Sequence, residues 1–138
     1  TLQDLVERDG PMSAEQAVPR MIDVIDGLIE AHGLGVIHRD VKPSNCFVDD
    51  DGRTKIGDFG LSKSLSGGSN LTRTGAFLGT PLYASPEQIR GESIDERTDV
   101  YSVAATLYYL LAGRPPFEGT DAAATLARMP PPARAICS

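Results

Sequence analysis

The segment from His38 to Asn45 constrains this chain more than any other part of its sequence. Within eight residues it carries the carboxylate of Asp40, the ammonium group of Lys42 and the carboxamide of Asn45. These are the groups that a loop needs to handle a proton, a phosphate charge and a metal ion together. Each side chain alone would be an ordinary loop or turn residue, so the interpretation depends on the whole set.

A short β-hairpin is predicted directly after this segment. Cys46 to Val48 and Arg53 to Gly57 are short strand-like runs, and the Asp- and Gly-rich residues 49–52 between them form a turn. The hairpin would hold Asn45 and Asp58 at adjacent ends. Such an arrangement suits two ligands of one metal site.

Helical patterns precede the segment. Thr1 to Arg8 predicts a short helix, and Ser13 with Gln16 forms a capping box that starts a second helix running to about His32. Pro19 lies inside this pattern and predicts a kink or a late helix start. Four apolar residues recur at helical spacing and are expected to face the core: Met21, Ile25, Leu28 and Ile29.

Further elements follow from the remaining pattern. Val36-Ile37 predicts a short strand, and residues 61–77, rich in Ser, Gly and Thr, predict a loop. Asp95 to Ala112 predicts a central, buried helix and Thr120 to Met129 a shorter one. The apolar residues expected to bury the central helix are Val103, Leu107, Leu110 and Leu111. The predicted class is α+β and mainly α-helical.

Composition excludes several classes of function. A chain of 138 residues with 41% hydrophobic residues can bury one core, as a single domain or part of one. The net charge of −6 argues against nucleic-acid binding, which needs clustered Lys and Arg. Cys46 and Cys137 show neither a disulfide framework nor zinc-ligand spacing, which fits a reducing, cytoplasmic setting. No apolar run is long enough to span a membrane.

Three further motifs follow the His38–Asn45 segment in order: Asp58-Phe59-Gly60, Gly79-Thr80-Pro81 and Ser85-Pro86-Glu87. With them, the sequence resembles the catalytic half of a eukaryotic-like protein kinase, most closely the serine/threonine kinases of bacteria. Ser85 stands where the family usually has alanine, a mild departure. The resemblance implies the large C-terminal lobe of a kinase, with ATP and Mg²⁺ as cofactors.

The resemblance also implies a domain plan for residues 1–138. Residues 38–45 would be the catalytic loop, residues 58–87 the metal-binding and activation segment, and residues 95–112 the central helix of the lobe. The small lobe, with its glycine-rich loop, strand lysine and helix glutamate, has no counterpart, nor do the last helices of the large lobe. We therefore expect a partial kinase domain that is inactive by itself.

The family's catalytic residues can be carried over by position. Asp40 would orient the substrate hydroxyl, and Lys42 would contact the γ-phosphate and so bind the nucleotide as well. Asn45 and Asp58 would bind the magnesium that holds ATP. Thr80 would bond with Asp40 and Lys42 and help to admit a Ser or Thr acceptor; otherwise it is an ordinary turn residue.

Other residues would have regulatory or structural roles. Arg39 beside the aspartate resembles kinases that are activated by phosphorylation, and Thr72 and Thr74 are the candidate acceptors. Most Ser and Thr residues in such a loop are simply solvated, which remains the alternative for both. His38 and Phe59 would pack as structural residues of the core.

Two acidic residues are also assigned structural roles by the resemblance. Glu87 would pair with an arginine much later in the domain, for which Arg134 is a poor candidate. Asp99 would accept hydrogen bonds from the catalytic-loop backbone. It could equally be a carboxylate that the helix dipole favours at the N-terminus of its helix.

The function implied for the parent protein is ATP-dependent phosphorylation of Ser and Thr hydroxyls on protein substrates. Two alternatives stay open: a non-catalytic interaction module made from a truncated kinase lobe, and a small-molecule phosphotransferase. A dimer of the parent kinase is left open, and the parent could be membrane-anchored with a cytoplasmic kinase domain.

Overall fold

The structure is a computed structural model of the chain and describes residues 1–59 and 81–130. These residues form α-helices, one 3₁₀ turn (η1) and a two-stranded antiparallel sheet, which confirms the predicted class. In chain order the elements are α1 (Leu2–Asp9), α2 (Ala14–Gly33), η1 (Pro43–Asn45), β1 (Cys46–Val48), β2 (Thr54–Ile56), α3 (Pro86–Arg90), α4 (Arg97–Ala112) and α5 (Ala122–Arg128).

Both N-terminal helices begin with a capping box, and that of α2 is the predicted one at Ser13 and Gln16. The Asp4 backbone N–H donates to the Thr1 hydroxyl at 3.2 Å, and the Ser13 N–H donates to Gln16 Oε1 at 3.0 Å. These bonds use amide groups that the first turn of a helix leaves without partners. Because α2 begins at Ala14, the late start expected from Pro19 is wrong.

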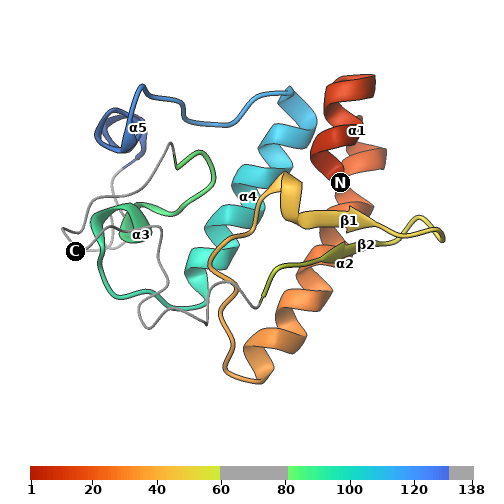
Figure 1. Ribbon diagram of the computed structural model, residues 1–138, viewed down its shortest axis with the longest axis horizontal. Coiled ribbons are helices and arrows are strands. Elements are labelled where there is room, and N and C mark those ends of the chain that lie inside the picture. Colours follow the sequence, from red (N-terminus) through yellow and green to blue (C-terminus); the bar gives the residue numbers. More distant parts are fainter. Residues whose placement is uncertain (60–80, 131–138) are drawn as a thin grey trace.

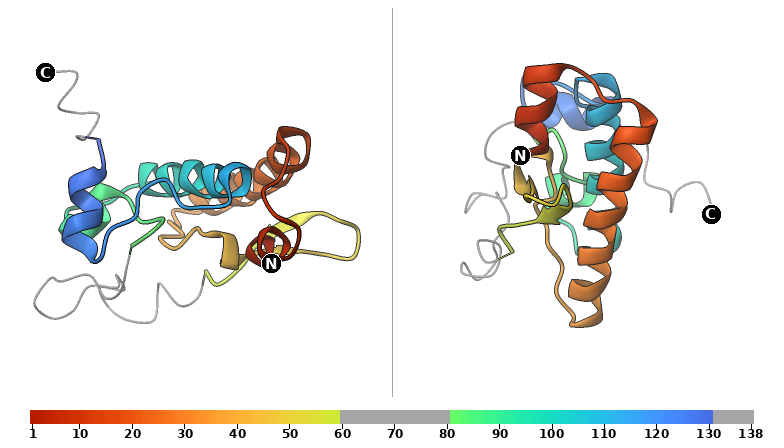
Figure 2. Two further views of the ribbon diagram at one scale, coloured as in Figure 1. Left: turned by 90° about the horizontal axis from the view of Figure 1, so that it is seen from above. Right: turned by 90° about the vertical axis from the view of Figure 1, so that its right-hand side faces the viewer.

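The helices α2 and α4 lie side by side in the middle of the molecule (Figure 1). The hairpin crosses them on one side together with α1, and α3 and α5 lie beyond α4 (Figure 2). The core lies between these layers and draws on α1, α2, the loop that contains Val41, β1 and α4. Its buried members are Leu2, Val6, Ala17, Met21, Val24, Leu28, Val41, Cys46, Tyr109 and Leu110.

The predicted hairpin is present as a short antiparallel pair of strands. Phe47 lies opposite Lys55, and the Asp49 N–H closes the turn by donating to the Arg53 carbonyl at 2.9 Å. The hairpin is attached to α2 because the Thr54 N–H donates to Asp23 Oδ2 at 2.9 Å. This anchor fixes the first residue of β2, at the turn end of the hairpin.

The predicted strand at Val36-Ile37 is absent from the structure. The backbone N–H of Val36 instead donates to the Ala31 carbonyl at the end of α2. The next residues of the loop direct their N–H groups toward a carboxylate on α4. These donors are therefore not available for pairing with a neighbouring strand.

The buried faces of the two central helices differ from the predicted ones. On α2, Met21 and Leu28 are buried as expected, but Ile25 and Ile29 are 39% and 62% exposed. On α4, Leu110 is buried, whereas Leu111 is 41% exposed. The buried residues of α4 include four polar ones, all at most 1% exposed: Thr98, Asp99, Ser102 and Thr106.

Candidate active site

Asp99 fixes the start of the catalytic loop from the first turn of α4. Its side chain is fully buried, and its two oxygens accept the backbone N–H groups of His38 and Arg39, each at 2.9 Å. The Nε2 atom of His32, at the end of α2, lies 2.7 Å from the same carboxylate. One carboxylate thus joins α2, α4 and the loop, which are distant in the sequence.

His38 connects the loop with the end of the hairpin. Its Nε2 lies 2.6 Å from the Gly57 carbonyl, and its Nδ1 lies 3.1 Å from the Asp40 backbone nitrogen. A carbonyl only accepts and a backbone N–H only donates, so the ring carries its proton on Nε2 and is neutral. The ring also makes an edge-on contact with Phe59 at a centroid distance of 4.5 Å.

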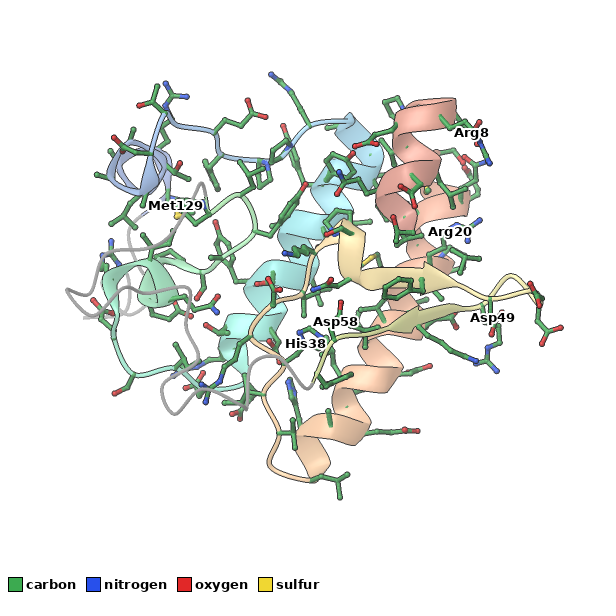
Figure 3. All side chains as sticks on the ribbon, viewed as in Figure 1. Arg8, Arg20, His38, Asp49, Asp58 and Met129 are labelled. Atoms are coloured by element: carbon green, nitrogen blue, oxygen red, sulfur yellow. The ribbon has the colours of Figure 1, made fainter. Side chains whose placement is uncertain are left out.

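His38 and Asp58 come from separate segments of the chain and lie close together beside α4 (Figure 3). The His38 side chain is fully buried. Burial and these contacts give it a packing and orienting position. It has no free ring nitrogen with which to act as a base.

Asp40, Lys42 and Asn45 meet within the loop. Lys42 Nζ lies 3.3 Å from Asp40 Oδ2, and both side chains are partly exposed to solvent. Asn45 Nδ2 donates to the Asp40 backbone carbonyl at 2.9 Å and to Asp40 Oδ2 at 3.1 Å. The carboxylate is therefore held in one orientation and remains accessible to a substrate.

Asn45 and Asp58 are brought together by the base of the hairpin. The Gly57 N–H donates to the Asn45 backbone carbonyl at 2.9 Å, so that Asp58 follows directly after this junction. Asp58 is exposed and has a left-handed backbone with φ of 61°, which is uncommon for a residue other than glycine. Such backbones concentrate at functional sites.

The donor set at this junction fits magnesium. Asn45 uses its amide nitrogen within the loop, which leaves a carbonyl oxygen, and Asp58 supplies a carboxylate. Both are hard oxygen ligands, and Mg²⁺ is commonly held by one or two such ligands together with water and phosphate. In residues 1–59 and 81–130, no cluster of three or more His, Cys, Asp and Glu side chains could hold a metal.

The short helix α3 was not predicted, although its signals are present. Ser85 caps it, Pro86 occupies its first turn and Gly91 ends it with a left-handed backbone, φ 69°. The Ser85 hydroxyl lies 2.6 Å from the Thr98 hydroxyl, and Thr98 Oγ1 donates to Glu87 Oε1 at 3.0 Å. Glu87 is thus bonded to α4, and Arg134 lies outside the described residues.

Two polar side chains, one that contacts the loop and one that contacts its anchor Asp99, were also missed. They are His32, which contacts Asp99, and Gln88, which donates from Nε2 to the Arg39 carbonyl at 2.7 Å. His32 lies near the end of a helix and Gln88 belongs to a capping box, and both are ordinary places for a polar residue. The sequence therefore did not indicate their distant partners. Their roles depend on tertiary packing.

Burial raises the pKa of two groups near the loop. The pKa of the Cys46 thiol rises to about 12 because the side chain is buried. The pKa of Tyr101 also rises to about 12, through burial and then through the negative charge of Glu87. Both groups stay neutral at ordinary pH, so neither supplies an anionic nucleophile.

Several predicted residues lie outside the part of the chain that the structure describes. Thr80, Thr72 and Thr74 fall within residues 60–80. The proposed activation sites and the threonine expected near Asp40 therefore stay predictions. The Arg39 guanidinium forms no ion pair with any carboxylate of the described residues.

Comparison with known families decides the affiliation. The family described as the protein kinase domain matches residues 1–132 of the chain. The chain belongs to the protein kinase family. Residues 38–45, Asp58 and α3 lie within the matched region.

Bacterial serine/threonine kinases are among the curated relatives of this kinase segment. It is 44% identical over 119 residues to the serine/threonine-protein kinase PknB of Mycobacterium leprae and 47% identical over 119 residues to a probable serine/threonine-protein kinase of Corynebacterium efficiens. Each alignment covers 86% of the chain. It is also 46% identical over 122 residues, 88% of the chain, to PknL of Mycobacterium tuberculosis.

The kinase segment spans only a minor share of these relatives. It covers 19% of the M. leprae protein, 18% of the C. efficiens protein and 30% of PknL. No helix among the described residues of the segment is long and apolar enough to cross a membrane.

Proposed function

We propose that the protein containing this chain transfers the γ-phosphoryl group of ATP to Ser or Thr hydroxyls of protein substrates. The observation that carries the proposal is the loop geometry. Lys42 and Asn45 both bond to the Asp40 carboxylate; Asp40 and Lys42 are partly open to solvent, Asn45 is buried, and Asp99 holds the loop backbone from inside. The serine/threonine kinases named above support the acceptor class.

Phosphoryl transfer asks little covalent chemistry of a protein, but it requires an oriented nucleophile and positive charge. Asp40 would accept a hydrogen bond from the acceptor hydroxyl and take its proton late in the reaction. Asn45 fixes that carboxylate by donating to it. Lys42, 3.3 Å from the carboxylate, is near enough to offset charge on the phosphoryl group beside the attacking hydroxyl.

Asn45 and Asp58 would hold Mg²⁺. An ion held by these two side chains would supply positive charge that offsets the negative charge of the ATP phosphates during transfer. The hairpin supports this role, because the bond between Gly57 and Asn45 fixes the two ligands at one junction.

Regulation and acceptor choice are part of the same proposal. A phosphate on Thr72 or Thr74 would pair with the Arg39 guanidinium, which lacks a carboxylate partner among the described residues. Thr80 would contact Asp40 and Lys42 when a Ser or Thr acceptor is bound. Protein substrates, a kinase dimer and a cytoplasmic setting remain predictions for the whole protein.

The test uses the complete gene product, generic protein substrates and Mg·ATP. Asp40→Asn should lower the transfer rate at least about 100-fold, the scale of a lost general base. Asp50→Asn, in the exposed hairpin turn, is the matched control and should leave the rate unchanged. Activity that survives Asp40→Asn would overturn the assignment.

The same assay separates the alternatives. Phosphorylation of an aminoglycoside or choline without phosphorylation of protein would favour the small-molecule phosphotransferases. A complete, folded gene product that transfers phosphate to nothing would favour the non-catalytic interaction module.

A further inference from the structure

The carboxamide of Gln88 contacts two segments that are far apart in the sequence. Gln88 lies on α3 and is only 8% exposed. Its Oε1 accepts the Ser85 backbone N–H at 3.0 Å, and its Nε2 donates to the Arg39 carbonyl at 2.7 Å. Because Oε1 is used by a donor, the amide orientation is fixed, and Nε2 is the atom directed at Arg39.

The Arg39 carbonyl belongs to the peptide group that leads into Asp40. The N–H of that same peptide donates to His38 Nδ1 at 3.1 Å. Gln88 on one side and His38 on the other therefore fix the plane of this peptide. The orientation of the plane determines the direction in which the Asp40 side chain leaves the backbone.

The peptide needs such support because Arg39 has a left-handed backbone, with φ of 73°. A residue with a β-carbon adopts this conformation at a cost, and it persists where neighbouring groups determine it. Asp99 holds the Arg39 N–H at 2.9 Å, and Gln88 holds the carbonyl of the same residue. Both polar groups of this strained residue are thus bonded to side chains from other elements.

From this geometry we infer that Gln88 is a positioning residue for Asp40 in the proposed phosphoryl transfer. It orients Asp40 by linking α3 to the loop that carries this residue. The position requires an amide, because one atom must accept and the other must donate. Glutamate would retain the bond to Ser85 but direct a second acceptor at the Arg39 carbonyl. The expected effect on catalysis rests on the proposed function, whereas the hydrogen bond between Gln88 and the Arg39 carbonyl is an observation of the structure.

Gln88→Glu tests the inference, and the chain offers a matched control in Gln16→Glu. Both glutamines occupy the third position of a helix and accept a serine N–H at 3.0 Å. Glutamate keeps such a capping box in both cases. Gln16 is exposed, and the capping serine N–H is its partner among the described hydrogen bonds.

The experiment measures kcat and the KM for ATP in the complete gene product, with hydrogen exchange of the Arg39 and Asp40 amides. Gln88→Glu should lower kcat about 10- to 100-fold, the scale of a small misplacement of a reacting group. KM for ATP should change less than about twofold, since nucleotide binding does not use the peptide. The two amides should exchange faster, and Gln16→Glu should change none of these quantities.

The outcomes are distinguishable. A wild-type protein without transfer activity overturns the proposed function, and faster amide exchange in Gln88→Glu would still support the link. Wild-type kcat and wild-type exchange in Gln88→Glu overturn the inference, as does an equal loss of kcat in Gln16→Glu. If Gln88→Glu does not fold, Gln88→Met, which is of similar length and uncharged, is judged by the same kcat and exchange criteria.

Discussion

Replacing Asp99 should destabilise the fold more than the loss of any exposed carboxylate. Asp99→Ala leaves the buried N–H groups of His38 and Arg39 without their acceptor and removes the contact with His32. A buried donor without a partner costs about 1–3 kcal/mol, so two of them predict a loss of about 2–6 kcal/mol. Asp99→Asn keeps one acceptor oxygen and should cost about half as much.

Urea unfolding of the chain, followed by circular dichroism, measures this loss. The free energy of unfolding should fall by about 2 kcal/mol per molar urea, so Asp99→Ala should lower the urea midpoint by about 1–3 M. Asp9→Ala is the control, because the ion pair of Asp9 among the described residues is an exposed one with Arg8, and its loss should not shift the midpoint measurably. A wild-type midpoint for Asp99→Ala would refute the argument that Asp99 holds the loop.

Three further predictions concern packing, titration and backbone conformation. Leu110→Ala should cost about 2–5 kcal/mol because Leu110 is fully buried, whereas Leu111→Ala should cost about 1 kcal/mol or less because Leu111 is 41% exposed. Burial raises the pKa of the Cys46 thiol from 9.0 to about 12, so the neutral thiol's contribution to stability is complete below pH 9 and is lost as the pH rises toward 12. Iodoacetamide at about pH 8 should therefore label Cys46 only after the protein unfolds. Gly113→Ala should destabilise the fold by about 1–2 kcal/mol, because Gly113 has a left-handed backbone with φ of 74°. Gly33→Ala should stabilise the fold slightly, because an added β-carbon there meets no atom within 4 Å.

Each of these predictions has an outcome that would contradict it. Equal unfolding midpoints for Leu110→Ala and Leu111→Ala would show that the burial difference is wrong. Labelling of Cys46 in folded protein, located by mass spectrometry, would contradict the buried thiol. A Gly113→Ala variant as stable as wild type would show that the left-handed cap of α4 is not required.

Elements controlled by neighbours in the sequence could be predicted well. The capping box of Ser13 and Gln16 starts α2 as expected, and the Asp- and Gly-rich turn pairs Cys46 to Val48 with the following strand. These features depend on hydrogen bonds that span a few residues, and such bonds follow from residue type and spacing.

Elements controlled by distant partners were predicted less well. Val36 and Ile37 are strand-forming residues, but the Val36 N–H donates to the Ala31 carbonyl and the His38 N–H donates to Asp99. These donors therefore cannot pair with a neighbouring strand. Ile25 and Leu111 are apolar and exposed, while Thr98 is polar and buried. Periodicity shows that a helix has an apolar face, but the orientation of the helix also depends on which polar side chains find partners in the interior.

The sequence by itself determined the chemistry of the loop, because Asp40, Lys42 and Asn45 are close in the chain and only a few backbone arrangements connect them. Tertiary structure alone decided how the loop is held. Asp99 and Gln88 bond to the loop from helices 49 to 61 residues away in the sequence. Their neighbours in the sequence do not indicate these partners. A hydrogen bond between distant segments forms only when the core has packed and excluded water, so its partners become known only in the folded chain.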